Sequence, residues 1–306
     1  MTTLVFGHKS PDTDSTGSPI IWAWYLNEIK GVAAAPALLG EPNTEALFML
    51  DHWKLDKPQI ISDVEADQPV VIVDTNNPAE LPASINDADI TAIIDHHRLV
   101  GGLETKGPVN IVMETLACTA TIMYKMIGDD MAQMPENIKG AMLTCILSDT
   151  LEFRSPTTTQ EDTAIAHALA KDLGVDIAEY AAQMFAAKSD VSSFSEAELL
   201  RMDSKEYEVG GKKFRVSVLE TTSPATVLNR KDALMAAMPG VATEDGADQV
   251  LLFVVDILNE EATMLIPNDF TKSVAEKSFG ATVTGDSVVL PGVMSRKKQI
   301  IPNIKA

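Results

Sequence analysis

Short runs of apolar residues alternate with helical patterns through the first half of the chain. The runs are compact and rich in branched residues, as in the buried strands of a parallel sheet, and cover residues 3–7, 33–39, 70–74, 90–95 and 109–113. Apolar residues recur at helical spacing in the stretches 15–30, 44–53, 118–131, 136–147, 160–173 and 177–187. Strands that alternate with helices predict an α/β domain with a doubly wound, mainly parallel sheet.

A polar, serine-rich stretch at residues 189–195 interrupts this pattern and predicts a hinge linker. Beyond it the order changes: we expect a helix at 196–202, a strand pair around Gly210-Gly211, a helix at 226–237 and two strands at 249–257 and 263–266. This order predicts a smaller α/β domain with a mixed sheet. The expected domains are therefore residues 1–188 and 196–306.

The net charge of the chain limits the classes of molecule that it can bind. Hydrophobic residues make up 45% of the 306-residue chain and charged residues 22%, which is ordinary for a folded globular protein. The formal net charge is -20, so the long-range field repels nucleic acid and anionic membranes. A site for a phosphate anion would therefore need cations of its own.

Neither the cysteines nor the apolar runs indicate secretion or a membrane. Cys118 and Cys145 lie within apolar helical patterns without metal-ligand spacing, which favours buried, reduced thiols. The first residues lack the pattern of a signal peptide, and the longest uncharged apolar runs are too short to span a bilayer. We expect a soluble, cytoplasmic protein.

Acids and histidines gather where predicted strands and one helix end. They are His8, Asp12 and Asp14 after the first strand, Asp74 and Asp95-His96-His97 at the ends of two later strands, and Asp149 after the helix expected at 136–147. Ligands of open α/β sheets bind beyond the carboxyl ends of the strands. Four separate segments thus deliver metal-binding side chains to the ends of elements.

Each of these residues also has an ordinary explanation. Asp12 and Asp14 can lie in a solvated turn or cap a helix, and Asp74 can be a turn residue. The distribution of the histidines favours a ligand role, because three of the five histidines in the chain lie in these loops. We interpret the other two, His52 and His167, as packing or surface residues within helices.

The combined set favours a pair of hard cations. It is rich in oxygen, has two imidazoles and lacks a thiolate, and therefore suits manganese, cobalt or magnesium better than a structural zinc. Six side chains exceed the needs of one ion that must also bind water and substrate. A carboxylate such as Asp74 can bridge two ions about 3.5–4 Å apart, the arrangement used in phosphoryl hydrolysis.

These residues also resemble a known superfamily. Asp95-His96-His97 is the motif that names the DHH phosphoesterases, and residues 7–15 (GHKSPDTDS) resemble the opening of the family II pyrophosphatases, with serine at position 10 where asparagine is common. Residues 73–76 and 147–150 resemble two further metal motifs of that family, and residues 295–299 (SRKKQ) its C-terminal signature. The resemblance extends over essentially the whole chain.

The resemblance implies a site with two Mn²⁺ ions per subunit, for which Co²⁺ or Mg²⁺ can substitute, and further Mg²⁺ that comes with the substrate. One ion would be held by His8, Asp12 and Asp74, and the other by Asp14, Asp74, His96 and Asp149. His97 would contact the substrate near its bridging or leaving oxygen and could supply a proton. Lys205, Arg296 and Lys297 would clamp the phosphate that is not attacked.

The basic C-terminal segment is consistent with such a clamp. Residues 287–306 contain four cations, Arg296, Lys297, Lys298 and Lys305, and no carboxylate. A run of charge is most often a solvated surface. Beside the metal motifs we favour an anion clamp for Arg296 and Lys297, because the guanidinium fork binds phosphate oxygens in pairs. Lys298 and Lys305 are expected to be surface charges.

The activity expected from the resemblance is Mn²⁺-dependent hydrolysis of inorganic pyrophosphate to two orthophosphates. A metal-bridging hydroxide would attack the substrate in a cleft between the domains, and the protein would be a homodimer paired through its larger domain. Two alternatives stay open. Another DHH enzyme, an exonuclease or nucleotide phosphodiesterase, would share the metal motifs, but we find no glycine- and histidine-rich motif in the second domain. A metal- or phosphate-binding module without activity would need neither the complete ligand set nor a clamp.

Overall fold

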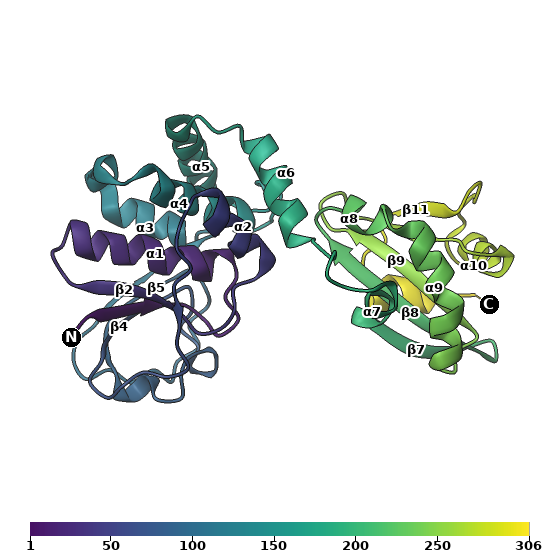
Figure 1. The fold of residues 1–306 in the computed structure, drawn as a ribbon, viewed down its shortest axis with the longest axis horizontal. Helices are drawn as coiled ribbons and strands as arrows, with labels where there is room; N and C mark the ends of the chain where they lie inside the picture. The colour runs from purple at the N-terminus through teal and green to yellow at the C-terminus, as the bar shows by residue number, and fades with distance from the viewer. Residues whose placement is uncertain (306) are drawn as a thin grey trace. The chain divides into compact units, whose positions relative to one another are not determined.

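The chain folds into two compact units that each have a sheet of their own. The computed structural model describes residues 1–305, apart from the side chain of Lys297. The first unit is Met1–Ala187, and the second begins at Lys188 (Figure 1). Among the helices of residues 1–305, none combines the length and the apolar character that a membrane-spanning segment needs.

The first unit contains six parallel strands in the order β3-β2-β1-β4-β5-β6. The strands are β1 (Thr3–Phe6), β2 (Ala34–Leu38), β3 (Gln59–Ile60), β4 (Pro69–Val73), β5 (Asp89–Asp95) and β6 (Asn110–Met113). The order reverses its direction between β1 and β4, which makes the carboxyl ends of these two strands the switch point where a doubly wound sheet binds ligands. The expected parallel sheet is confirmed, whereas the two-residue strand β3 was too short to be predicted.

Helices cover one face of this sheet. They are α1 (Thr13–Glu28), α2 (Thr44–His52), α3 (Thr119–Ile127), α4 (Glu136–Asp149), α5 (Gln160–Leu173) and α6 (Ile177–Lys188). In Figure 1, α1, α3 and α4 lie on the same side of the strands. The helix expected at 118–131 ends earlier, at Ile127, because Gly128 takes a left-handed conformation (φ 57°) and a 3₁₀ segment follows.

The other face of the sheet is covered without α-helices. Two 3₁₀ turns, Pro78–Glu80 and Ile85–Asp87, form part of the connection from β4 to β5. Leu81 and Ile85 pack there with apolar strand residues such as Phe6 and Ile72, and these side chains are almost fully buried. The connection is compact because it buries its apolar residues against the sheet rather than extending into solvent.

The second unit contains a mixed sheet in the order β11-β10-β9-β8-β7. The strands are β7 (Ser204–Val209), β8 (Lys212–Thr221), β9 (Gln249–Asp256), β10 (Glu261–Leu265) and β11 (Ser287–Pro291). Only β8 and β9 pair in parallel, and the other neighbours are antiparallel. The continuous apolar run of β9 has a clear cause: Val250, Leu252 and Val254 pack into one core, whereas Leu251, Phe253 and Val255 pack into a second core on the opposite face.

The helices of this unit are α7 (Glu196–Met202), α8 (Ala225–Leu228), α9 (Lys231–Glu244) and α10 (Asp269–Phe279). The single helix expected at 226–237 was wrong, because two helices occupy this stretch and α9 continues through Pro239. Pro239 is exposed, so the backbone carbonyl that it leaves without an amide partner can be hydrated, and Leu234 and Met238 stay buried at helical spacing. The sequence analysis did not predict α10 and β11.

Candidate metal centre

The side chains expected as metal ligands lie together beyond the carboxyl ends of β1, β4 and β5. Their nitrogen and oxygen atoms form three overlapping groups, and the atoms within each group lie within 4.8 Å of one another. The groups are His8, Asp12 and Asp74; Asp14, His96 and Asp149; and Asp74, His96 and His97. The fold therefore brings the six expected ligands, together with His97, from four distant segments to one position at the switch point of the sheet.

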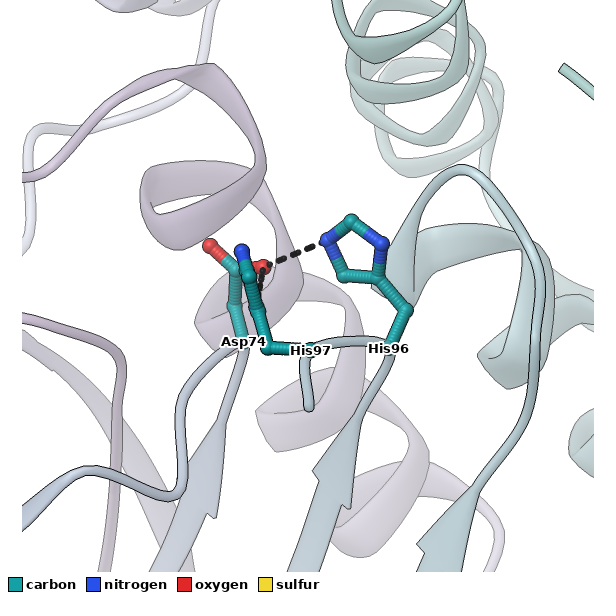
Figure 2. Close-up of side chains that lie close together, drawn as sticks. All are labelled: Asp74, His96 and His97. Carbon is teal, nitrogen blue, oxygen red and sulfur yellow. Dashed lines mark ion pairs between the residues drawn. The ribbon is translucent and has the colours of Figure 1, made fainter. Parts of the chain in front are cut away.

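Asp74 lies between the two sides of this cluster. Its Oδ2 atom is 3.6 Å from His8 Nε2, and its Oδ1 atom is 3.3 Å from His96 Nε2. Figure 2 shows His96 and His97, from the end of β5, beside the carboxylate of Asp74. Because each oxygen faces a different imidazole, the carboxylate has the orientation that a bridge between two cations requires.

The backbone of Asp74 is strained and firmly held. Its φ angle is 58°, in the left-handed region that residues other than glycine seldom adopt. The backbone N–H donates to the carbonyl of Ile94 over 2.9 Å, and Thr119 Oγ1 donates to Asp74 Oδ1 over 3.2 Å. Strain of this kind persists where the surrounding structure fixes the residue, and it is common at functional sites.

The loop after β1 is shaped by Ser15. Its hydroxyl accepts a hydrogen bond from the backbone N–H of His8 over 2.8 Å, and its own N–H donates to Asp12 Oδ1 over 3.0 Å, which caps α1. A Cβ atom at Gly7 would lie 1.9 Å from Ser15 Oγ, so only glycine permits this close approach. The sequence between Gly7 and Ser15 therefore places His8 and Asp12 on the same side of the loop.

Asp14 lies in the first turn of α1 and is almost fully buried. Ser18 Oγ donates to its Oδ1 atom over 2.6 Å, and the backbone N–H of Thr119 donates to its Oδ2 atom over 2.7 Å. Thr119 thus contacts both Asp14 and Asp74, at the start of α3. The sequence analysis missed this residue, because a threonine at a helix start carries no signal of its own.

Asp149 ends α4, and its Oδ2 atom is buried without a hydrogen-bond partner in the described part of the chain. Leu151, Glu152 and Phe153, which follow closely, all have positive φ angles of 48°, 52° and 69°. A buried carboxylate oxygen without a donor is unfavourable, and a bound cation would relieve it.

The electrostatics of the cluster lead to the same conclusion. Burial raises the pKa of Asp74 well above its usual value, and the nearby carboxylates of Asp14, Asp12 and Asp95 raise it further. Burial, Asp14 and Asp74 likewise raise the pKa of Asp149. The protein therefore clusters carboxyl groups whose mutual repulsion is relieved by protonation or by bound cations.

The two histidines after β5 have different partners. His96 Nδ1 lies 3.2 Å from the carbonyl oxygen of Leu116, which can only accept, so Nδ1 donates to this oxygen and Nε2 faces Asp74. His97 Nδ1 lies 2.9 Å from Asp95 Oδ1, and the His97 side chain is 52% exposed. His96 is thus oriented as a metal ligand, whereas His97 also reaches solvent.

Asp95 is the buried anchor of this loop. It accepts hydrogen bonds from Asn76 Nδ2 over 2.5 Å and from the backbone N–H of His97 over 3.0 Å. Burial alone would raise the pKa of Asp95, but the hydrogen bonds from His97 and Asn76 outweigh it and hold the pKa below its usual value. Asp95 stays ionised and fixes the His97 ring.

A cavity of about 780 Å³ opens beside the cluster. His8 and His97 line it together with Lys9 and Arg98, so two cations accompany the imidazoles in its wall. The cavity is large enough for a small phosphate compound, and its charge partly offsets the acidic character of the chain.

The donor set fits Mn²⁺, Co²⁺ or Mg²⁺. Four carboxylates and two imidazoles supply hard and borderline ligands. Cys118 and Cys145 lie near this set, but burial and then the carboxylate of Asp14 raise the pKa of each thiol well above its usual value. The thiols stay protonated and are poor ligands, in agreement with the expectation of buried, reduced cysteines.

The residues expected as a phosphate clamp lie in the second unit. Lys205 and Arg296 line one cavity of about 580 Å³, together with Tyr207 and Ser295. The guanidinium of Arg296 donates to the backbone carbonyl and the Oδ1 atom of Asp203, each over 2.8 Å. Asp203 was not anticipated from the sequence. The side chain of Lys297 lies outside the described part of the chain.

A turn held by hydrogen bonds presents Arg296. Residues 296–300 form one turn of π-helix, and Ser295 Oγ accepts from the backbone N–H of Lys298. Gln299 Oε1 accepts from the backbone N–H groups of Met294 and Ser295, each over 2.9 Å. The serine and glutamine of the SRKKQ segment therefore shape the loop, while its arginine lines the cavity.

The histidines outside the cluster pack as expected. His52 lies against the rings of Phe48, Trp53 and Tyr180, and His167 stacks on Phe153. A further buried acid that the sequence analysis did not single out is Glu45, which accepts hydrogen bonds from Thr13 and Ser148 beside the cluster. No local pattern marks it, because its partners are distant in the sequence.

The first unit carries carboxylates and imidazoles beyond its strand ends, and the second unit has a mixed sheet. Comparison with protein families gives the class of two-domain proteins to which this chain belongs, the DHH class. Residues 2–149 match the DHH family, N-terminal domain, and residues 182–306 match the DHHA2 domain.

Individual relatives identify the family within this class. A protein of Deinococcus radiodurans is 39% identical over 98% of this chain and 97% of its own, and one of Lactobacillus acidophilus is 36% identical over 98% and 96%; both carry the name "Probable manganese-dependent inorganic pyrophosphatase". A solved structure from Methanococcus jannaschii, assigned provisionally to the family II inorganic pyrophosphatases, is 30% identical with a TM-score of 0.62, and the match covers 99% of this chain and 98% of that one. The chain belongs to the family II, manganese-dependent inorganic pyrophosphatases.

Proposed function

We propose that this protein hydrolyses inorganic pyrophosphate to two orthophosphates at a site that binds two divalent cations, with Mn²⁺ as the principal metal. The observation that carries the proposal is the orientation of Asp74, whose two oxygens face His8 on one side and His96 on the other. The names of the relatives support both the substrate and the metal.

The ligand assignment follows the two sides of the cluster. His8, Asp12 and Asp74 would hold one ion, and Asp14, Asp74, His96 and Asp149 would hold the other. When bound, two such cations lower the pKa of a water molecule and neutralise phosphate oxygens. Thr119, Ser18 and Ser15 keep the carboxylates and the first loop in place, so little reorganisation is needed when substrate binds.

In this proposal His97 contacts the substrate rather than the metal ions. Its ring is half exposed and is fixed through Nδ1 by Asp95, which leaves Nε2 available to the bridging or leaving oxygen of pyrophosphate. A proton held at that nitrogen stabilises the departing phosphate. Replacement of His97 should therefore lower turnover more than it lowers Mn²⁺ affinity.

The second unit supplies the clamp. We assign Lys205, Arg296 and Lys297 to the phosphate that is not attacked, because Lys205 and Arg296 line one cavity and Arg offers paired donors to phosphate oxygens. Phosphoryl transfer depends on positioning and charge neutralisation, so the protein needs no covalent nucleophile. Additional Mg²⁺ would enter with the substrate.

Residues 189–195 are our proposed hinge linker between domains at 1–188 and 196–306. Arg230 donates to the carbonyls of Val191 and Phe194, and Ser189 Oγ accepts from the backbone N–H of Thr222, so both ends of the linker are anchored to the second unit. Scattering curves that coincide with and without a non-hydrolysable pyrophosphate analogue would count against a hinge. A homodimer, proposed from the family resemblance, can be tested by sedimentation equilibrium.

The decisive experiment measures phosphate release after chelator treatment, with Mn²⁺ restored to one sample and omitted from the other. Pyrophosphate, a short oligonucleotide and a nucleotide dimer serve as substrates in parallel. We expect rapid release from pyrophosphate only when Mn²⁺ is restored, with both nucleotides intact. Cleavage of the nucleotides instead would keep the metal site and reject the proposed substrate.

A further inference from the structure

Glu45 is a buried acid outside the proposed ligand set. It lies in the first turn of α2, and its exposed fraction is 0%. The N-terminus of a helix favours a carboxylate, but burial of such a group is still costly unless its oxygens accept hydrogen bonds. The contacts of Glu45 therefore indicate why the chain keeps an acid at this position.

Those contacts reach two of the segments that carry expected metal ligands. Thr13 Oγ1 donates to Glu45 Oε2 over 2.9 Å, and Ser148 Oγ donates to the same oxygen over 2.7 Å. Thr13 stands between Asp12 and Asp14, and Ser148 immediately precedes Asp149. A single carboxylate oxygen thus connects the start of α1 with the end of α4.

We propose that Glu45 is a positioning residue for the metal centre, which sets the separation between the Asp12–Asp14 segment and Asp149. Without cations the clustered carboxylates repel one another and favour a wider site. The connection through Glu45 opposes this movement and keeps the ligands close to the separation that binding requires. Contacts to the residues around metal ligands typically change metal affinity by about 10- to 100-fold.

This proposal rests on the proposed two-metal function and is tested by metal binding rather than by turnover. The dissociation constant of Mn²⁺ is measured by calorimetry and by electron paramagnetic resonance for wild type, Glu45→Ala and Glu45→Gln, and urea unfolding gives the stability of each metal-free protein. We expect Glu45→Ala to weaken Mn²⁺ binding by about 10- to 100-fold. Glu45→Gln keeps an acceptor oxygen and should lose less affinity than Glu45→Ala.

Tyr180→Phe is the matched control, because it removes a buried hydroxyl that bonds Trp53 and Thr144, and Thr144 lies in α4 one turn before Ser148 rather than next to a proposed ligand. It should lower stability and leave Mn²⁺ affinity unchanged. Wild-type affinity in Glu45→Ala, or an equal loss of affinity in a Tyr180→Phe protein of similar stability, would overturn the proposal. A wild-type protein that does not bind Mn²⁺ would instead contradict the proposed function itself.

Two further variants keep the test valid if Glu45→Ala does not fold. Thr13→Val and Ser148→Ala each remove one donor and leave Glu45 with the other. Each is expected to weaken Mn²⁺ binding severalfold, and the double variant should lose more than either single one. Wild-type affinity in both single variants would reject the positioning role.

Discussion

Most side chains of the candidate metal centre are held by residues that also make a second contact within the site. Thr119 donates to both Asp14 and Asp74, and Ser15 both caps α1 and accepts from the N–H of His8. Such shared contacts fix several ligands relative to one another with few residues. They also mean that replacement of one small polar residue displaces more than one ligand.

Arg296 allows a direct test at the residue scale. Arg296→Ala should lower the rate of pyrophosphate hydrolysis by about 10²- to 10³-fold, because removal of one donor to a developing charge typically costs that much. Steady-state phosphate release at saturating Mn²⁺ measures the effect. Lys298→Ala is the control, since Lys298 is exposed in the same turn and should be neutral. Unchanged turnover in Arg296→Ala would remove its assigned role.

Lys54 offers a prediction on stability. It follows α2 with a φ of 54°, and its side chain is 78% exposed. Glycine adopts this left-handed conformation without the steric cost of a Cβ atom, so Lys54→Gly should raise the free energy of unfolding by about 1 kcal/mol in urea denaturation. Lys171→Gly, at an exposed position inside α5, should lower it by about 0.5–1 kcal/mol. The same sign for both variants would contradict this explanation.

At the scale of elements, a network of polar and aromatic groups joins α2, α4 and α6. The Tyr180 hydroxyl lies 2.6 Å from Thr144 Oγ1 and accepts from Trp53 Nε1 over 2.8 Å. Gly140 permits this packing, because a Cβ atom there would lie 2.1 Å from the Trp53 ring. Three helices that are distant in sequence thus meet around one tryptophan.

The network makes stability depend on pH in the alkaline range. Burial raises the pKa of Tyr180 to about 12, from 10.0 for an exposed tyrosine. A raised pKa in the folded state means that folding favours the protonated phenol. The stability that Tyr180 contributes is therefore complete below pH 10 and is lost as the pH rises toward 12. The free energy of unfolding is measured in urea for wild type and for Tyr180→Phe at pH 8 and at pH 11.5. The difference between the two proteins should be smaller at pH 11.5 than at pH 8 by about 2 kcal/mol. A difference that stays constant with pH would reject this.

At the scale of the whole molecule, the proposed metal site and the proposed phosphate clamp belong to two units with separate cores. Phe6 and Ile72 belong to a core of the first unit, whereas Leu252 and Phe253 belong to two cores of the second. The proposed metal ligands all lie in the first unit, and the proposed clamp residues Lys205 and Arg296 lie in the second. Cations should therefore stabilise the first unit selectively.

Calorimetry of the full chain tests this division. A ligand at 100 times its dissociation constant adds about 2.7 kcal/mol per site, so two Mn²⁺ ions should raise the thermal transition of the first unit by about 10–20 °C and leave the other transition unchanged. Leu252→Ala identifies the transition of the second unit, because it removes a fully buried side chain there. Asp149→Asn should lose much of the shift. Equal movement of both transitions would contradict the assignment.

Much of the architecture followed from periodicity alone. The alternation of apolar strands with helical patterns predicted the parallel sheet, and the apolar run at 249–257 predicted the strand β9. Prediction failed where local signals were weak or misleading. The strand β3 has only two residues, α10 buries few apolar side chains, and Pro239 lies within α9 because its side of the helix is exposed.

For the candidate site too, some features were predictable from the sequence and others were not. The sequence by itself determined the candidate metal ligands, because His8 and Asp74 follow strands whose ends a parallel sheet brings together. Only the tertiary structure decided the orientation of the two Asp74 oxygens and the connection of Thr13 to Ser148 through Glu45. These depend on contacts between segments tens of residues apart, and no local pattern in the chain encodes such distances.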